Sequence, residues 1–195
     1  MQKFISYIKT FKKIGYLSLI MVFIHRFKIK IGFYKFILPI KNCPIPEDLK
    51  LSRNYRDIKL PNKWGLESSS RCIDKADKFL CGKILLFSRE KYLFNNVPNW
   101  FLDQIPNSID HSNNHWSDFQ HFKGNDIKRT WELSRFSWAP LLARATLLTG
   151  NIKYLSLINK WVNNWCIKNP INGGPNWICG QEVSIRLIHM MQTWK

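Results

Sequence analysis

Residues 125–138, NDIKRTWELSRFSW, combine two carboxylates, three basic side chains and two tryptophans within fourteen positions. On one continuous helix, steps of 3, 4 and 3 residues bring two cations and two indoles onto a single face: Lys128, Trp131, Arg135 and Trp138. Indoles stack on sugar rings or bases, while lysine and arginine bind anionic groups. The spacing therefore predicts a surface that holds a charged ligand.

Two features of the same stretch support a purely structural alternative. Glu132 lies four residues after Lys128 and three before Arg135, which is the spacing of ordinary helix ion pairs. Pro140 is expected to kink or restart the helix near Trp138. The tryptophans would then belong to a hydrophobic core, and both interpretations stay open on this stretch alone.

A second candidate site is GPNWICGQEVSIR, residues 174–186. Its Gly-Pro-Asn-Trp loop would present the amide of Asn176 and the indole of Trp177 at the mouth of a helical cavity. In the helix that follows, Glu182 and Arg186 are four residues apart and can form an ion pair, with Arg186 pointing into the cavity. The structural alternative is a capped helix with an ordinary ion pair.

Histidines and cysteines show no spacing that favours a metal site. His111, His115 and His121 are separated by 4 and 6 residues in a polar stretch without an acidic cluster. The cysteines are scattered and odd in number, which favours free thiols in a reducing compartment: Cys43, Cys72, Cys81, Cys166 and Cys179. We therefore expect neither a metal nor another cofactor.

Three regions of the chain must position these residues. Residues 1–40 are basic, apolar and compatible with helices. Residues 41–124 are an irregular, proline-rich connecting region, with a short strand over 83–87 and a helix over 70–79. Residues 125–195 are predicted to form consecutive helices with short connections. The expected fold is mainly α, with antiparallel helical hairpins.

Turn-forming residues mark the helix boundaries within residues 125–195. Asn151 is placed to cap a helix after Thr149-Gly150, and Asn169-Pro170 is placed to end it. Apolar side chains recur in this helix with the helical period: Ile152, Leu155, Ile158, Trp161, Val162, Trp165 and Cys166. A further amphipathic helix begins near Gln181 and includes Val183, Leu187, Ile188 and Met191. Because it is still amphipathic at the last residues, we expect the chain to be part of a longer protein.

The charge balance favours a polyanionic partner. Thirty Lys and Arg against 13 Asp and Glu give a formal net charge of +17. Anionic lipid, acidic polysaccharide and nucleic acid all fit this charge, but the chain has no recognised nucleic-acid-binding module, so nucleic acid is not the expected partner.

The N-terminal region leaves two structural alternatives. The uncharged run from Ile14 to Ile24 is eleven residues long, short of the roughly 20 that cross a bilayer. It lacks a small-residue cleavage site and is flanked by basic residues on both sides, which disfavours a secretory signal. Residues 1–40 are therefore expected either to contact an anionic membrane surface or to pack on the domain as a helical hairpin. A cytoplasmic or inner-membrane peripheral location is favoured, with a periplasmic or secreted one as the alternative.

Two long stretches together carry a resemblance to a known family. DIKRTWELSRFSWAPLLARATLLTGNIKYL, followed by WVNNWCIKNPINGGPNWICGQEVSIR, resembles the N-terminal region of the heparinase II/III family of polysaccharide lyases, and is similar also to alginate lyases. Several patterns occur in the family's order over roughly residues 125–190. They include Trp-Glu, Arg-Phe, Leu-Ala-Arg-Ala, Asn-Pro, Gly-Pro-Asn-Trp, Gln-Glu and Ile-Arg.

The resemblance implies both a fold and a reaction. The fold is an incomplete (α/α) toroid, which precedes a β-sandwich in full-length members. The reaction is β-elimination at a uronic acid: the sugar carboxylate is neutralised, a Tyr or His base removes the adjacent proton, and an acid assists the leaving oxygen. The family's Asn-His and Tyr segments follow the Gln-Glu, Ile-Arg helix. The Asn113-Asn114-His115 run precedes the Trp-Glu helix, so it does not match them.

The sequence hypothesis is therefore a lyase fragment that binds an acidic polysaccharide and is inactive alone. The residues expected to face or shape its cleft are Lys128, Trp131, Arg135, Asn176, Trp177, Glu182 and Arg186. In this hypothesis Arg135 and Arg186 neutralise anionic groups, Trp177 stacks on a sugar, and Glu182 orients Arg186. The alternative is a noncatalytic protein that binds polysaccharide or a membrane surface.

Overall fold

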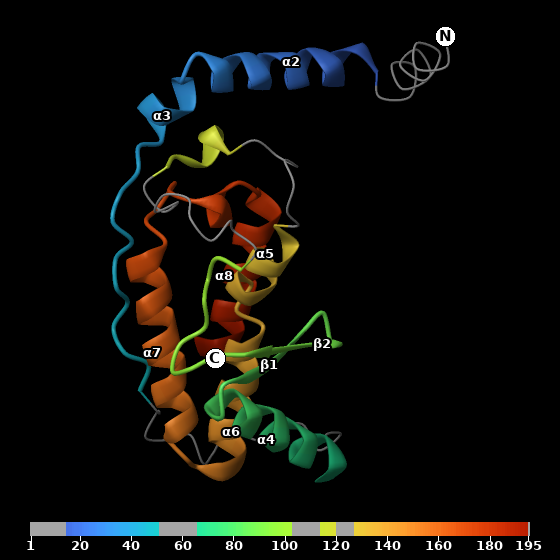
Figure 1. Ribbon diagram of the computed structural model, residues 1–195, viewed down its shortest axis with the longest axis vertical. Coiled ribbons are helices and arrows are strands. Elements are labelled where there is room, and N and C mark those ends of the chain that lie inside the picture. Colours follow the sequence, from blue (N-terminus) through green and yellow to red (C-terminus); the bar gives the residue numbers. More distant parts are fainter. Residues whose placement is uncertain (1–14, 51–65, 103–113, 120–126, 195) are drawn as a thin grey trace. The chain divides into compact units, whose positions relative to one another are not determined.

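The computed structural model describes residues 15–50, 66–102, 114–119 and 127–194. It is mainly helical, as the sequence predicts, with one short two-stranded sheet in the described ranges (Figure 1). The chain divides into two compact units, Met1–Pro39 and Ile40–Lys195.

The first unit contains helices α2 (Tyr16–Lys30) and α3 (Phe33–Ile37). A hydrogen bond of 2.9 Å between His25 Nδ1 and Tyr34 Oη joins them, and the ammonium of Lys28 lies 5.1 Å from the ring centre of Phe33. Neither helix has a buried residue. No helix within the described ranges combines the length and hydropathy that a membrane span requires.

The second unit is built from five helices, a hairpin and two short 3₁₀ turns within the described ranges. In chain order the elements are α4 (Leu66–Leu80), β1 (Lys83–Leu86), β2 (Glu90–Leu93), η3 (Trp116–Asp118), α5 (Lys128–Ser134), α6 (Trp138–Thr149), α7 (Lys153–Lys168), η4 (Pro175–Trp177) and α8 (Gly180–Trp194). The predicted strand over 83–87 and helix over 70–79 are confirmed as β1 and α4. Helices α6, α7 and α8 run up and down in succession, and α6 contacts both of the others as well as α4 (Figure 1).

The predicted boundaries of α7 are confirmed by specific contacts. Gly150 ends α6 with a φ of 68°, a left-handed conformation that glycine adopts without strain, and its N–H bonds to Thr146. The side chain of Asn151 then accepts a hydrogen bond of 3.0 Å from the N–H of Lys153. At the other end, α7 stops at Lys168, and Asn169 donates backbone and side-chain N–H groups to the carbonyl of Trp165.

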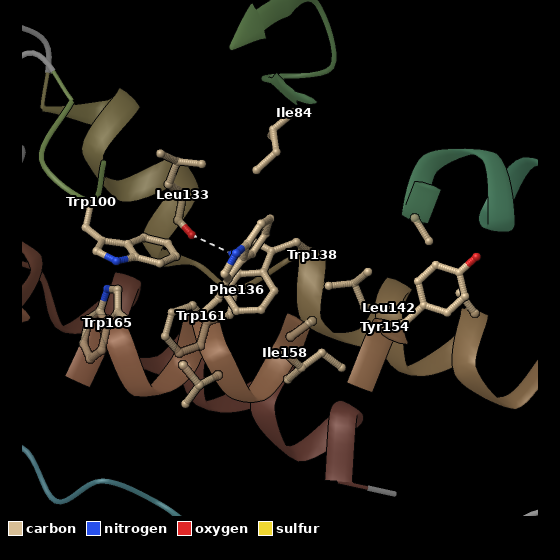
Figure 2. Close-up of a cluster of buried hydrophobic side chains, with 14 of the residues drawn as sticks. Ile84, Trp100, Leu133, Phe136, Trp138, Leu142, Tyr154, Ile158, Trp161 and Trp165 are labelled. Atoms are coloured by element: carbon tan, nitrogen blue, oxygen red, sulfur yellow. Dashed lines mark hydrogen bonds between the residues drawn. The ribbon is translucent and has the colours of Figure 1, made fainter. Parts of the chain in front are cut away.

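Aromatic side chains fill the core of the second unit (Figure 2). The ring of Trp161 lies edge-on to Trp138, with centroids 5.0 Å apart, and is fully buried. Its indole N–H donates to Asn96 O at 3.3 Å, and that of Trp100 donates to Asn164 Oδ1 at 2.8 Å. These two buried indoles therefore keep polar partners, so they contribute apolar contact without an unsatisfied donor.

Two details of the predicted apolar faces differ from the structure. Ile152 is 63% exposed because it precedes α7, and Tyr154 takes the buried position in the first turn instead. Three apolar residues of α8 are more than half exposed: Leu187, Ile188 and Met191. The buried positions of α8 are Glu182 and Arg186, and Met190 is partly buried against the core. Charged side chains therefore contribute much of the packing of this helix.

An extended segment follows α7 in the opposite direction. Lys41 exchanges backbone hydrogen bonds of 3.1 and 2.7 Å with Ile171, just beyond the end of α7. Eight residues later, the N–H and carbonyl of Leu49 bond to the side chain of Asn159. These two attachments place Cys43 beside the C-terminal half of α7.

Candidate functional site

The helix that begins with Lys128 ends before Trp138, so the predicted single face is not formed. Phe136 has a φ of 62°, a left-handed conformation that is costly for a residue with a Cβ, and it separates α5 from α6. Trp138 is the first residue of α6 and is only 3% exposed. The prediction that it shares a surface with Trp131 and Arg135 is wrong, whereas the restart of the helix near Pro140 is confirmed.

Side chains satisfy the backbone carbonyls left open at the end of α5. The indole N–H of Trp138 donates to Leu133 O at 3.1 Å (Figure 2), and Arg186 Nε donates to Ser134 O at 2.7 Å. His189 Nδ1 lies 2.6 Å from Arg135 O. A carbonyl only accepts, so Nδ1 of His189 carries the hydrogen. Three carbonyls that lack helical partners are thereby paired.

A bidentate salt bridge joins the two candidate motifs. Nε and Nη2 of Arg135 donate to the two oxygens of Glu182 at 2.6 and 2.7 Å, and Nη1 donates to Glu132 at 2.7 Å. The hydrogen bonds that Arg135 donates to Glu182 raise the pKa of Arg135. The expected pair between Glu132 and Arg135 is confirmed. The expected pair between Glu182 and Arg186 is not formed, because both oxygens of Glu182 bond to Arg135.

Arg186 is buried among aromatic rings. Its guanidinium carbon lies 4.4 Å from the ring centre of Trp165, 5.6 Å from Trp177 and 5.8 Å from Phe136. Nη2 also donates to Asn176 O at 3.1 Å. Burial lowers the pKa of Arg186 to about 10, which leaves the guanidinium charged at neutral pH. The ring faces and two carbonyls replace the water that this cation loses.

The Gly-Pro-Asn-Trp loop is also fixed by hydrogen bonds to other residues of the second unit. Asn176 is fully buried, and its Nδ2 donates to Asn169 Oδ1 at 2.8 Å. The indole N–H of Trp131 donates to Pro175 O at 3.0 Å. Trp177 is partly buried, with its ring 6.0 Å from that of Trp165. The loop residues therefore pack against the helices, and their contact with a sugar stays a prediction.

The structure brings most predicted site residues into one network, which we call the motif network. Its members are Trp131, Arg135, Asn176, Trp177, Glu182 and Arg186, together with the backbone groups that they bond. Lys128 lies at the start of α5 and is exposed. Substrate contact by these residues stays a prediction, because most of their polar groups already bond within the protein.

The histidine stretch has a structural role at its one described member. His115 is 4% exposed, and its Nδ1 accepts a hydrogen bond of 3.2 Å from the N–H of Ser117 at the start of η3. It also forms an isolated antiparallel bridge with Gly173. His111 and His121 lie outside the described residues. Within the described ranges, no group of three or more metal-ligating side chains is present.

A groove that the sequence patterns did not indicate lies between α4, α6 and α8. Its volume is about 840 Å³, and Arg71, Lys75 and Arg144 are among its lining residues. The only sequence signal is the i, i+4 spacing of Arg71 and Lys75 on one face of α4. Their proximity to α8 depends on tertiary packing.

Comparisons of the chain with models of known protein families, with curated proteins and with solved structures find no match. The resemblance to the heparinase II/III family therefore rests on the sequence patterns alone.

Replacing Glu182 tests the ion pair that joins the motifs. Glu182→Gln keeps the shape of the side chain but removes the carboxylate that forms a bidentate salt bridge with the partly buried Arg135. We expect the free energy of unfolding in urea to fall by about 3 kcal/mol. The matched control is Asp74→Asn, because Asp74 pairs with Lys78 at 2.6 Å on an exposed helix face. This control should cost less than about 1 kcal/mol, and equal losses would contradict the structural role of Glu182.

The thiol of Cys43 lies beside α7 and is unusually acidic. A hydrogen bond with the Cys166 side chain lowers the pKa of Cys43 to about 7, burial opposes this shift, and the charge of Arg186 adds to it. The pKa of Cys166 is raised, first by the same hydrogen bond and then by burial. Because Cys43 is also the less buried thiol of the pair, we expect it to ionise first.

Alkylation by iodoacetamide, followed peptide by peptide with mass spectrometry, measures this acidity. Only the thiolate reacts, so the rate at Cys43 should rise with pH and reach half of its maximum near pH 7. In Cys166→Ala the midpoint should move up toward the ordinary thiol value of about 8.5. Cys81→Ala removes an exposed thiol elsewhere and should leave the midpoint unchanged. An unchanged midpoint in Cys166→Ala would refute the role of Cys166.

Proposed function

We propose that this chain is the N-terminal helical part of a polysaccharide lyase similar to the heparinase II/III family. Its ligand would be an acidic, uronate-containing polysaccharide. The observation that carries the proposal is that the two stretches with the family's patterns meet in the folded chain. Arg135 of the first stretch bonds to Glu182 of the second, and Arg186 bonds back to Ser134. Residues about 50 positions apart thus form one structural unit.

The helix arrangement is consistent with part of an (α/α) toroid. Helices α6, α7 and α8 follow one another with alternating direction, as in successive hairpins (Figure 1). The exposed side of α8, with Leu187, Ile188 and Met191, is the kind of apolar face that a next hairpin would cover. The incomplete toroid is a proposal, supported by this order and by the exposed face.

In this proposal the motif network shapes the cleft, and the cationic surface attracts the polymer. β-Elimination also needs a base and an acid at the sugar ring. In the family these come from segments that follow the Gln-Glu, Ile-Arg helix. We therefore propose that the 195-residue chain binds acidic polysaccharide without cleaving it.

Titration of the full chain with polymers tests this function. Tryptophan fluorescence should respond to polygalacturonate, alginate and heparin but not to neutral dextran, and binding should weaken with added salt because it depends on charge. Single-stranded DNA of equal charge is the comparator for nonspecific attraction. No unsaturated uronate, detected by its ultraviolet absorbance, should accumulate.

Three results would reject or revise this proposal. Failure to bind any uronate polymer, or equal binding of dextran, would reject it. Tighter binding of DNA than of every uronate polymer would assign the charge to nucleic acid instead. Formation of an unsaturated uronate would show that the chain contains its own catalytic groups.

A second candidate function is contact with an anionic membrane surface through the first unit. The observation that favours it is that α2 has no buried residue and exposes a run of apolar side chains: Tyr16, Leu17, Ile20, Met21, Val22, Phe23, Ile24 and Phe27. Lys28 and Lys30 lie in the last turn of the same helix. Apolar and basic side chains on one short helix are typical of segments that bind anionic lipid interfaces.

Vesicle sedimentation tests the membrane candidate. The full chain should sediment with vesicles that contain phosphatidylglycerol more than with pure phosphatidylcholine. Leu17→Ser/Met21→Ser should reduce the bound fraction, because both side chains lie on one side of α2. Leu93→Ser/Ile167→Ser is the matched control, since it removes two side chains of the second unit that are 68% and 62% exposed. Equal bound fractions for the two double variants would reject this function.

A further inference from the structure

The groove between α4, α6 and α8 is bordered by cations from two helices. Arg71 and Lys75 lie one turn apart on α4, and Arg144 faces them from α6, where its Nη2 donates to Ser68 Oγ at 3.2 Å. None of the described residues that line the groove is acidic. A cavity with cations and no anion on its described lining attracts ligands that carry oxyanions.

The pKa of the Cys72 thiol is influenced by the same cations. Cys72 is buried at the groove, and its thiol lies 3.6 Å from the carbonyl oxygen of Leu141. Burial raises the pKa of this thiol, while the charges of Arg144 and Lys75 act in the opposite direction. Cations from both α4 and α6 therefore act on one point in the groove lining.

Neutral polar groups from α4 and α8 also line the groove. Ser68, Gln192 and Thr193 can exchange hydrogen bonds with hydroxyl groups. His189 is oriented by its contact with Arg135 O, so in the neutral imidazole Nε2 is the hydrogen-bond acceptor. This contact connects the groove directly to the motif network.

We infer that this groove binds a short stretch of acidic oligosaccharide. Arg71, Lys75 and Arg144 would hold the carboxylate or sulfate groups, and the hydroxyl, amide and imidazole groups would bond to sugar hydroxyls. The assignment rests on the proposed function and adds a location that the sequence motifs did not indicate. A volume of about 840 Å³ lies within the usual range for small-ligand sites.

The lining favours a sugar over nucleic acid. Single-stranded nucleic acids bind through bases that stack on aromatic side chains. No Trp, Tyr or Phe is among the described residues that line the groove, whereas hydroxyl and amide groups are. An oligosaccharide can use those groups, while an unstacked base would lose its main contact.

The test compares two charge-matched double variants of the full chain. Arg71→Gln/Lys75→Gln removes two cations from the groove, and Lys91→Gln/Lys168→Gln removes two exposed cations that do not line it. Titration calorimetry would use tetragalacturonate, a carboxylate-only ligand, and a heparin tetrasaccharide, which also carries sulfate. Maltotetraose and a short oligonucleotide are the neutral and nucleic-acid comparators. Thermal unfolding of each variant verifies that it is folded.

The groove variant should bind tetragalacturonate at least roughly tenfold more weakly than wild type, as the loss of charged hydrogen bonds predicts. The control variant should change the dissociation constant by less than about twofold, since its charges act only at long range. A larger effect of the groove variant on the heparin tetrasaccharide would identify sulfate as the preferred oxyanion, and a larger effect on tetragalacturonate would identify carboxylate.

Other outcomes overturn the assignment and separate it from the proposed function. If both double variants bind tetragalacturonate as tightly as wild type does, the ligand binds elsewhere on the chain. That result would leave the proposed function intact. Binding to long uronate polymers without binding to either tetrasaccharide would also overturn the groove alone. Absence of polymer binding in wild type would reject both. Oligonucleotide binding that depends on Arg71 and Lys75, without tetrasaccharide binding, would assign the groove to nucleic acid.

Discussion

The left-handed turn at Phe136 is the constraint on which the second unit depends. A buried phenylalanine in this conformation costs on the order of 1–2 kcal/mol, and it leaves the last carbonyls of α5 without helical partners. Trp138, Arg186 and His189 bond to those carbonyls, so the start of α6 and one face of α8 converge on the end of α5. The positive charge of Arg186 at a helix C-terminus also suits the helix dipole. These hydrogen bonds stabilise the turn, because the carbonyls of Leu133, Ser134 and Arg135 all have partners.

The positive charges of the two arginines in the motif network are stabilised in different ways. Arg135 is partly exposed and binds carboxylates from both motifs, so its charge is neutralised by direct pairing. Arg186 is almost fully buried, and aromatic faces and carbonyl oxygens surround it. Cation–π contacts of desolvated groups are worth about 2 kcal/mol, which offsets only part of the lost hydration. Charged residues therefore fix how α8 docks, while the tryptophan core supplies the apolar burial.

Local patterns predicted the helices well, because their signals lie within a few residues. Gly150, Asn151 and Asn169 end and begin helices through their own backbone and side-chain bonds. The prediction that Trp138 shares one helix face with Trp131 and Arg135 is wrong because of the turn at Phe136. Unlike glycine, phenylalanine gives no local sign of a left-handed conformation. The predicted ion pair between Glu182 and Arg186 is also wrong. Glu182 instead binds Arg135, which is 47 residues away in sequence, so local spacing could not indicate this pair. The cationic groove needs three helices, so only its α4 spacing is visible in the sequence.

Nuclear magnetic resonance mapping of the full, isotope-labelled chain with tetragalacturonate tests most directly where an acidic sugar binds. We expect amide shifts to concentrate in Arg71–Lys75 and His189–Thr193, on the two sides of the groove, with smaller changes at Arg135 through its contact with His189. Shifts centred on Lys128 and Trp131, with none around Arg71 and Lys75, would contradict it. That result would place the ligand on the exposed start of α5 and assign the groove no part in binding.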